Sequence, residues 1–470
     1  MNSAWIAFLP AALLAAPACA ADGPPNIVFV LFDDIGYGQP TCYRADSPFK
    51  TPSIDRLARE GMRFTDAHSA ASNCTPTRYG VLTGRYPARI GQFGVLKTYS
   101  APIIPRTRPT VASFLRQHGY HTACIGKWHL GMTWVDRKPG GDKQLPVGAR
   151  LTDGPNAVGF DYFYGYTHAR NIGSIIEQDA VVANVRAVEN QPLMIAKAVD
   201  QIEQRAGADK PFFLYFPMCP PHSPLAVAPR YAGVSGVSGK AGKYADWVLQ
   251  GDAMLGQILD ALERTGQSEN TLVIATGDNG AARRPYPPLR AAKSSIYEGG
   301  HREPYVARWP GKIRAGSVNH DVICLTDLFA TCADIVGATL PADAAEDSVS
   351  ILPCLLGTAT APVREATVHQ SPGDGRLSIR QGPWKLIFGR SGRRELYNLR
   401  SDISETTDVA GAHADVVGRL EKLMQSYIDR GRSTPGPERQ NDVELSLDER
   451  RGKKKKKRKE GARSSTGGRK

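Results

Sequence analysis

Cysteine is sparse in this chain, with eight among 470 residues. That scarcity excludes a fold held together by a disulfide framework. No CxxC pair or cysteine–histidine cluster has the spacing of a zinc site. Beyond the N-terminus no apolar run is long enough to span a membrane, and no internal repeat is present. With 41% hydrophobic and 22% charged residues, the composition predicts an ordinary globular protein.

The first twenty residues are apolar and end in Ala18-Cys19-Ala20. This pattern predicts a secretory signal peptide, residues 1–20, cleaved near Ala20, and hence a secreted or periplasmic protein. Attachment of a lipid to Cys19 is an alternative. Cleavage leaves seven cysteines, an odd number, which is compatible with one cysteine standing apart from the others.

Positive charge is concentrated at the C-terminus. The chain carries a net charge of +13, and residues 450–470 alone contribute +11. A segment almost free of apolar residues cannot form a core, so we expect residues 431–470 to form a disordered basic tail. The tail is either a solvated end or a contact to an anionic polysaccharide, membrane surface or cell envelope. We expect no specific nucleic-acid partner.

Apolar runs without polar alternation alternate with helical patterns. Such runs predict strands buried on both faces, as in parallel sheets. They are Asn26–Phe32, Thr122–Ile125, Pro211–Phe216 and Thr271–Thr276. The helical patterns are Thr110–His118, Tyr244–Thr265 and Thr326–Val336. The alternation predicts an α/β domain over residues 21–365 with a large, mostly parallel sheet flanked by helices.

The character of the sequence changes from about residue 366. Short glycine-punctuated segments predict a small antiparallel sheet, and His413–Tyr427 reads as an amphipathic helix that closes it. We therefore expect a C-terminal α+β subdomain over residues 366–430.

Each predicted strand is followed directly by polar residues, where ligands bind in parallel sheets. Asp33 and Asp34 follow the first strand, and Asp278 with Asn279 follows the last. Oxygen ligands without histidine or cysteine favour Ca²⁺ or Mg²⁺. The alternative is that both pairs merely form turns.

Cationic side chains follow the two middle strands. Lys127 and His129 lie in one loop, and His222 lies in the proline-rich PPHSP loop. Near a cation these groups suit the binding and protonation of an oxyanion ester. Individually, each is as compatible with an ordinary surface or packing role.

Cys74 stands in SNCTPTRYGVLTG, at the expected start of a helix, with Pro76 in the first turn and Arg78 one turn on. A helix N-terminus and an arginine would both stabilise a thiolate. A reactive cysteine, a buried inert one and a disulfide-bonded one are the open alternatives.

Eight motifs together carry a family resemblance. CTPTRYGVLTG and GYHTACIGKWHLG resemble the two signatures of the formylglycine-dependent sulfatases of the cysteine type, and further segments resemble that family in its order. These are LFDDIGYG, PPHSP, TGDNG, KSSIYEGGHREP, WKLIFG and ELYNL. The resemblance spans roughly residues 25–430 and is closest to arylsulfatase A and N-acetylgalactosamine-6-sulfatase. It implies the fold of the alkaline phosphatase superfamily.

The resemblance implies a role for Cys74 as a precursor. A maturation enzyme would oxidise it to Cα-formylglycine, whose hydrate attacks sulfur. Ca²⁺, or alternatively Mg²⁺, would be held by this residue together with Asp33, Asp34, Asp278 and Asn279.

Further roles follow from the same resemblance for the cationic and hydroxyl groups. Lys127, His222 and Lys293 would neutralise the sulfate oxygens, with His222, either alone or together with Lys293, protonating the leaving alcohol. Arg78 would orient the hydrate, and His129 would take the proton that lets sulfate leave. Thr167 would contact the sulfate.

Two positions depart from the family pattern. Gln39 replaces an acidic residue, and His301 stands in EGGHREP where a small apolar residue is common. We interpret Gln39 as a residue behind the site and His301 as either a substrate-pocket or a loop residue.

The expected function is therefore hydrolysis of an aryl or carbohydrate sulfate monoester, with a sulfated polysaccharide as one possible substrate. Two alternatives stay open. One is a formylglycine-dependent phosphonate monoester or phosphodiester hydrolase of the same superfamily. The other is a non-catalytic protein that binds sulfated glycans.

Overall fold

The computed structural model describes residues 23–135, 144–284, 286–372 and 375–447. The predicted signal peptide and residues 448–470 of the predicted tail lie outside the described residues. No helix within the described ranges combines the length and the apolar content needed to cross a membrane.

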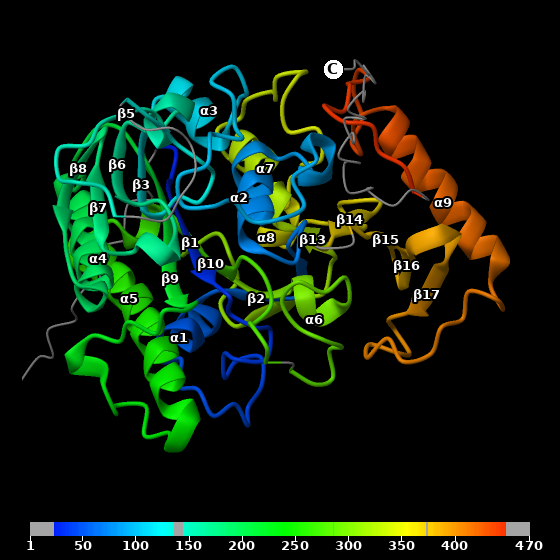
Figure 1. The fold of residues 1–470 in the computed structure, drawn as a ribbon, viewed down its shortest axis with the longest axis horizontal. Helices are drawn as coiled ribbons and strands as arrows, with labels where there is room; N and C mark the ends of the chain where they lie inside the picture. The colour runs from blue at the N-terminus through cyan, green and yellow to red at the C-terminus, as the bar shows by residue number, and fades with distance from the viewer. Residues whose placement is uncertain (1–22, 136–143, 285, 373–374, 448–470) are drawn as a thin grey trace, which may run out of the picture.

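A sheet of eleven strands forms the centre of the molecule (Figure 1). Its order is β12-β2-β11-β10-β1-β9-β3-β6-β7-β8, with β13 paired to β2. The five strands β10, β1, β9, β3 and β6 run parallel. The central strands are β1 (Asn26–Asp33), β3 (His121–Lys127), β6 (Tyr162–Tyr166), β9 (Phe212–Pro221) and β10 (Thr271–Gly277). The remaining strands of this sheet are β2 (Met62–His68), β7 (Ser174–Glu177), β8 (Ala180–Asn184), β11 (Arg302–Arg308), β12 (Ser317–Asn319) and β13 (Ile323–Cys324).

The expected mixed α/β fold with a large central sheet is confirmed, and four of its strands are the predicted apolar runs. The sequence did not indicate the antiparallel strands on either side of the parallel centre. β11 pairs antiparallel with both β10 and β2, and β7 pairs antiparallel with β6 and β8. A separate two-stranded sheet joins β4 (Thr133–Trp134) to β5 (Leu151–Asp153).

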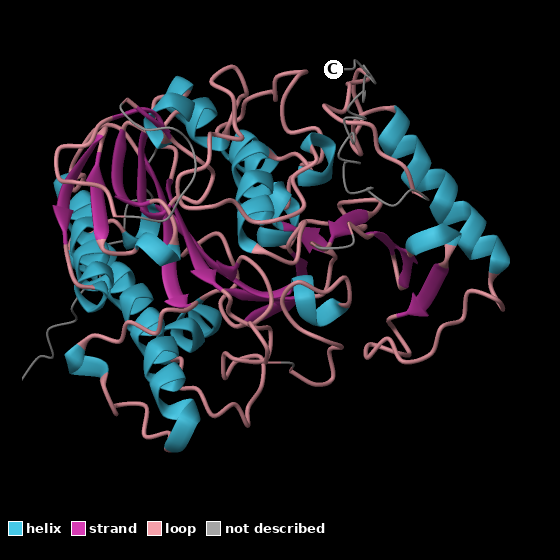
Figure 2. Ribbon diagram, in the orientation of Figure 1, coloured by secondary structure: helices cyan, strands magenta, loops and turns pink. Residues whose placement is uncertain are grey.

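Helices cover both faces of the central sheet, which explains why its strands are apolar without alternation (Figure 2). Ile27, Phe29 and Leu31 of β1 belong to a core with α2, α3 and α7, whereas Val28 and Val30 belong to a core with α1, α4 and α5. On the first face lie α2 (Cys74–Thr83), α3 (Val111–Gln117) and α7 (Leu328–Ile335). On the second lie α1 (Pro52–Glu60), α4 (Ala187–Gln204) and α5 (Gly242–Arg264). Two short helices, α6 (Glu298–His301) and α8 (Leu352–Leu355), complete this part.

The C-terminal part is a four-stranded antiparallel sheet covered by one helix, at the right of Figure 1. It comprises β14 (Thr367–Gln370), β15 (Leu377–Gln381), β16 (Trp384–Phe388), β17 (Arg394–Asn398) and α9 (Ala414–Asp429). Val416, Leu420 and Met424 of α9 pack on Ile379 and Leu386 of the sheet. The expected small C-terminal antiparallel sheet is therefore confirmed.

Residues 431–447 lie against the core, although we expected an unfolded tail from residue 431. Asp442 accepts a hydrogen bond from Arg85 at 2.9 Å, and Asn441 accepts one from Arg89, also at 2.9 Å. Thr434 is buried and donates to the Glu346 carbonyl at 2.9 Å. Buried arginines of the main domain therefore anchor a segment whose own composition is too polar to indicate order.

Candidate active site

The two acidic pairs predicted from the sequence meet at the ends of neighbouring parallel strands. Asp33 is the last residue of β1, and Asp278 follows β10 directly. Asp34 has a left-handed backbone with φ 70°, and its N–H donates to Asp278 Oδ1 at 3.1 Å. Asn279 Nδ2 donates to Asp34 Oδ1 at 2.7 Å. The strand ends thus place four oxygen-bearing side chains in one buried cluster.

Cys74 opens α2 beside this cluster. Its Sγ and carboxylate oxygens of Asp33 and Asp278 all lie within 4.8 Å of one another. Every residue of α2 is buried, so the helix is a rigid platform for the thiol. Among the described residues Cys74 is a free cysteine. This relationship is the one on which a formylglycine site depends.

The Cys74 thiol is not the stabilised thiolate that its position suggested. Burial raises the pKa of Cys74, and the opposing charges of Lys127 and Lys293 do not offset that effect. A neutral buried thiol is a poor nucleophile. Of the three alternatives for Cys74, the structure favours a buried neutral thiol, and a precursor role does not require a thiolate.

Arg78 connects the helix to both strand ends. Its guanidinium donates to Asp278 Oδ2 from Nη2 at 2.8 Å and to the Lys127 carbonyl from Nη1 at 2.8 Å. Its Nη2 also lies 3.7 Å from Asp33 Oδ1. Because the arginine is fully buried, these bonds fix the orientation of α2 against the sheet.

Two lysines supply buried positive charge. Lys127 Nζ donates to Asp33 Oδ2 at 2.5 Å, and Lys293 Nζ donates to Asp34 Oδ1. Burial by itself raises the pKa of Asp33, but Lys127 and the neighbouring cations hold it well below its ordinary value. Burial, followed by the Asp33 charge, raises the pKa of Asp278 to about 7. Positive charge added beside Asp278 would favour its ionised form.

The predicted histidines border the same cluster. His222 Nε2 lies 3.8 Å from Asp34 Oδ2, and its Nδ1 contacts the Ser223 carbonyl. His129 is buried, and its Nε2 lies 3.1 Å from the Leu96 carbonyl. That carbonyl selects the Nε2–H tautomer, which leaves Nδ1 as a buried acceptor without a partner among the described residues.

Thr167 and His168 lie beside His129. The His129 N–H donates to the Thr167 carbonyl at 2.9 Å, and Thr167 Oγ1 has no partner among the described groups. Sequence reasoning missed His168, whose ring packs edge-on against His129 with centroids 4.2 Å apart. Burial, followed by the Lys127 charge, lowers the pKa of His168 to about 3. Only its place next to Thr167 in GYTHARN could have indicated it.

The two positions that depart from the family pattern lie outside the reacting cluster. Gln39 is buried, accepts from the Gly36 N–H at 2.6 Å and donates to the Tyr244 hydroxyl at 2.8 Å. It therefore braces the turn after β1. His301 is fully buried at the end of α6, where it contacts His68 and Lys385.

The donor set fits a hard divalent cation. Asp33 Oδ1 and Asn279 Oδ1 are buried oxygens without a hydrogen-bond partner among the described residues. Unpaired buried oxygens are costly unless a ligand completes them. The acceptor atoms of Asp33, Asp34, Asp278 and Asn279 are oxygens, which suits Ca²⁺ or Mg²⁺ better than a thiophilic metal.

Comparisons with known proteins agree with this geometry. Residues 25–338 match the family model described as Sulfatase. The chain is 35% identical to human arylsulfatase A, covering 88% of this chain and 89% of that protein. It is 29% identical to an N-acetylgalactosamine-6-O-sulfatase of Bacteroides thetaiotaomicron, covering 86% and 93%. The solved structure of the sulfatase PsFucS1 from Pseudoalteromonas sp. superposes with a TM-score of 0.74 at 27% identity, covering 86% and 90%.

Proposed function

Because this chain belongs to the sulfatase family, we propose that it releases inorganic sulfate from a saccharide sulfate monoester at the site around Cys74. Cys74 is the precursor of Cα-formylglycine, made by a separate maturation enzyme. Asp33, Asp34, Asp278 and Asn279 hold Ca²⁺, with Mg²⁺ as the alternative ion. The observation that carries the proposal is the convergence of Cys74 with two strand-end carboxylates within 4.8 Å.

Two groups act besides the unmodified side chains: the divalent ion and the hydrated aldehyde of residue 74. A divalent ion supplies positive charge beside the reacting oxygens, and the hydrated aldehyde supplies the nucleophilic hydroxyl. Everything else comes from buried side chains whose positions the fold fixes in advance, which is the condition for electrostatic stabilisation of a transition state.

Sulfate binding falls to the cationic groups. Lys127 and Lys293 already lie on the carboxylates of Asp33 and Asp34, at the edge of the cluster. There they neutralise the sulfate oxygens as negative charge develops. Thr167, with its unpaired hydroxyl, donates one further hydrogen bond to the sulfate.

Proton transfer falls to two histidines on different sides of residue 74. His222 donates a proton from Nε2 to the leaving alcohol oxygen. Burial lowers the pKa of His222 in the free protein, and the negative charge of a bound ester opposes that effect and favours its charged form. His129 takes a proton at Nδ1 from the hydroxyl at position 74 when sulfate departs. Arg78 holds the start of α2 so that this hydroxyl faces both groups.

Saccharide sulfates are the proposed substrates because the relatives named above include an N-acetylgalactosamine-6-O-sulfatase. We also propose export through the N-terminal signal peptide. The basic tail would then hold the enzyme on a sulfated polysaccharide or another anionic surface.

One set of measurements tests the function. The protein is made in a host that contains the maturation enzyme. Sulfate release is then measured from p-nitrophenyl sulfate and from a panel of sulfated saccharides. The peptide containing residue 74 should show the mass change for CH₂SH replaced by CHO, and Cys74→Ala should be inactive. An aldehyde-bearing protein that prefers phosphonate or phosphate diesters would support the related hydrolase instead. An unmodified Cys74 with glycan binding and no turnover would support the binding protein.

A further inference from the structure

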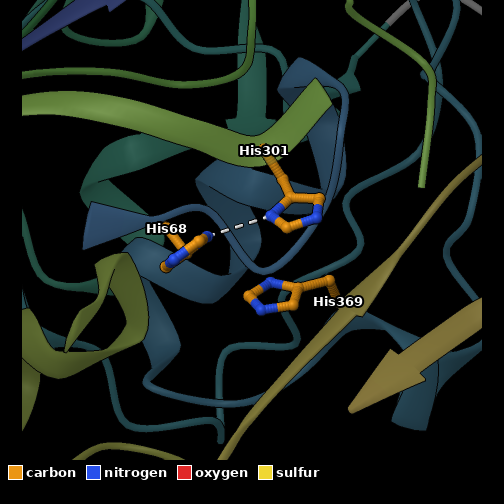
Figure 3. Close-up of side chains that lie close together, drawn as sticks. All are labelled: His68, His301 and His369. Atoms are coloured by element: carbon orange, nitrogen blue, oxygen red, sulfur yellow. Dashed lines mark hydrogen bonds between the residues drawn. The ribbon is translucent and has the colours of Figure 1, made fainter. Parts of the chain in front are cut away.

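Three buried histidines from three separate elements meet where the central and C-terminal sheets join (Figure 3). His68 ends β2, His301 ends α6 and His369 lies in β14, and none of the three side chains is exposed. His68 Nδ1 lies 3.1 Å from His301 Nδ1, and the ring of His369 stacks on that of His301 with centroids 4.0 Å apart. Such a cluster either holds a metal ion or shares hydrogen bonds.

The geometry argues against a metal ion. The rings of His301 and His369 are within 9° of parallel, so their lone pairs lie in separate planes and do not converge on one point. Both nitrogens of His369 are already bonded, to the Ser69 carbonyl at 3.0 Å and to Thr367 Oγ1 at 2.9 Å. In addition, Lys385 Nζ lies 3.0 Å from His301 Nε2, which puts a cation beside the ligand set.

Lys385 fixes the direction of the hydrogen bonds at one end. An ammonium group has three N–H donors and no acceptor. Lys385 Nζ has three partners: Glu298 Oε1 at 3.0 Å, Glu405 Oε1 at 2.7 Å and His301 Nε2 at 3.0 Å. The Ile296 carbonyl lies 3.1 Å from the same nitrogen and would favour a proton there. The charge-assisted bond from the ammonium is the stronger of the two, so we infer that His301 accepts at Nε2 and donates from Nδ1 to His68.

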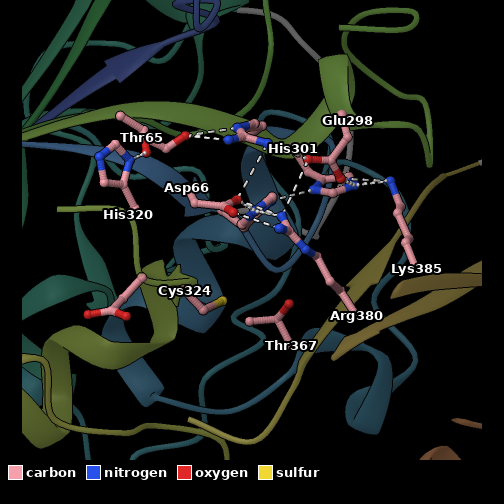
Figure 4. Close-up of polar contacts among 12 residues, drawn as sticks. Thr65, Asp66, Glu298, His301, His320, Cys324, Thr367, Arg380 and Lys385 are labelled. Atoms are coloured by element: carbon pink, nitrogen blue, oxygen red, sulfur yellow. Dashed lines mark hydrogen bonds and ion pairs between the residues drawn. The ribbon is translucent and has the colours of Figure 1, made fainter. Parts of the chain in front are cut away.

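Asp66 fixes the same direction at the other end (Figure 4). His68 accepts at Nδ1, so its proton is on Nε2, which lies 2.7 Å from Asp66 Oδ1. Arg380 Nη1 is 3.0 Å from that nitrogen and 2.5 Å from the same carboxylate oxygen, so both groups direct a proton to Asp66. Asp66 and Arg380 also line a cavity of about 870 Å³, which is the end of this relay nearest to solvent.

His68 leads directly into the segment that carries the nucleophile position. The N–H of Ser69, the next residue, donates to the His301 carbonyl at 2.8 Å. Five residues later Cys74 begins α2. The two histidines thus clamp the start of the Ser69–Asn73 segment through both side chain and backbone.

α6 leads, in the other direction, to the segment that carries a sulfate-binding lysine. The N–H of Ser294 donates to the Ser72 carbonyl at 2.7 Å, which joins the two segments again just before Cys74. Lys293, the preceding residue, places its Nζ on Asp34. Both active-site segments are therefore anchored on the same pair of histidines.

We propose that Lys385, His301 and His68 form a positioning relay, in which each residue donates a hydrogen bond to the next and His68 donates to Asp66. Through this relay the C-terminal sheet fixes the segments that carry Cys74 and Lys293. The relay rests on the proposed function, since it holds the groups that carry out sulfate hydrolysis. The three residues are positioning residues, because none of them touches the reacting atoms.

Imidazole nitrogen NMR of histidine-labelled full-length protein tests the relay without any substrate. The expected spectrum has neutral rings, with the proton of His301 on Nδ1 and that of His68 on Nε2. A proton on Nε2 of His301, or a charged ring, would overturn the proposal. So would stoichiometric metal that is lost together with His301.

Kinetics of matched variants test the consequence. His301→Asn keeps a donor toward His68 but loses the acceptor for Lys385, and His301→Gln keeps that acceptor but loses the donor. Each should lower kcat for p-nitrophenyl sulfate about 10-fold per formylglycine, with KM little changed, since small displacements of reacting groups are costly. His369→Asn keeps a donor toward the Ser69 carbonyl and leaves the relay intact, so its kcat should stay near wild type.

The outcomes separate this proposal from the proposed function. His301 variants that unfold at lower temperature but keep the wild-type kcat per formylglycine would show a merely structural role and overturn the relay. If the matured wild-type protein hydrolyses no sulfate ester, the proposed function fails, and the NMR result still decides the hydrogen-bond direction.

Discussion

Arg78 Nη2 donates to Asp278 Oδ2 at 2.8 Å across 200 positions of sequence. One residue lies on α2, four positions after Cys74, and the other follows β10. The bond therefore sets the distance between the precursor of the nucleophile and the carboxylates that would bind the cation. Both side chains are fully buried, so no solvent screens the pair.

The first prediction concerns Arg78→Lys. A lysine keeps the charge but cannot donate to Asp278 and to the Lys127 carbonyl at once, because it lacks the planar fork of arginine. We expect kcat for p-nitrophenyl sulfate to fall about 100-fold, the size of effect that misplaced reacting groups produce. Steady-state kinetics, corrected for the formylglycine content of residue 74, measure it.

Arg89→Lys is the matched control. Arg89 is also buried and makes a similar two-pronged contact, to Asp347 at 2.7 and 2.8 Å, but it ties the main domain to the C-terminal segment. Its replacement should lower the unfolding temperature and leave kcat unchanged. Equal kinetic losses in both variants would show that Arg78 acts through stability alone.

Much of the parallel core could be predicted because local sequence determines it. Residues 27–32 and 272–275 are apolar at every position, and only strands covered on both faces need that pattern. β11 could not be predicted in the same way. Its sequence, REPYVAR, contains charged residues that are buried only because distant partners neutralise them, such as Glu60 for Arg308.

The candidate site, like the fold, could be predicted only in the part that local sequence determines. The motifs identified the residues of the site, and Asp33, Lys127 and Asp278 also follow predicted strands. The pairing of Lys385 with His301, and of residues 441 and 442 with buried arginines, depends on contacts between segments far apart in sequence. No local pattern reports such contacts, so neither the relay nor the docked segment 431–447 could be predicted.

The second prediction concerns divalent ions. Removal of Ca²⁺ by a chelator should lower the unfolding temperature and abolish activity, because Asp33 Oδ1 and Asn279 Oδ1 lose their partner and like charges repel. Asn279→Ala should shrink the rise in unfolding temperature that added Ca²⁺ causes. Asn156→Ala, at an asparagine bonded to Phe160 and Gln178 instead, should keep the full rise. A Ca²⁺ response unaffected by Asn279→Ala would place the ion elsewhere.

The third prediction separates the two halves of turnover. His129→Gln keeps an N–H toward the Leu96 carbonyl but removes the acceptor at Nδ1, so the proton that accompanies sulfate release has no base. Alcohol release should show one rapid turnover followed by a steady rate slower by about 100-fold, within the range of general base catalysis. Rapid-quench measurements with p-nitrophenyl sulfate reveal the burst. A uniformly slow first turnover would assign His129 to the attack step instead.

The fourth prediction concerns the basic tail. Deleting residues 450–470 removes +11 of the charge of the chain. Affinity for a sulfated polymer should fall and lose most of its salt dependence, whereas turnover of p-nitrophenyl sulfate stays unchanged. Binding isotherms at two salt concentrations measure the effect. Unaltered polymer affinity in the shortened protein would end the idea of a tether.

The last prediction is a pH dependence of stability. Burial lowers the pKa of His68, and it lowers those of His301 and His369 well below their ordinary value. Below the ordinary value of 6.5 the unfolded chain therefore binds protons that the folded chain does not. The contribution of these three histidines to the free energy of unfolding therefore falls as pH is lowered through this range, by about 1.4 kcal/mol per pH unit for each.

Among the groups packed around the three histidines, Glu405 acts in the opposite sense, because burial raises its pKa. The pKa values of Asp66 and Glu298 are raised by burial but brought well below their ordinary values by their cationic neighbours, so these carboxyls lose their contribution only at lower pH. Lys385, Arg380, Arg302 and Glu405 complete the charged surroundings.

Urea unfolding of the full chain between about pH 5 and 8 measures the dependence of the free energy of unfolding on pH, which is the slope meant here. His369→Asn should reduce it by one histidine's share, because its asparagine does not titrate. An unchanged slope in this variant would mean that His369 is protonated in the folded protein, and that its stack with His301 is not a contact between neutral rings.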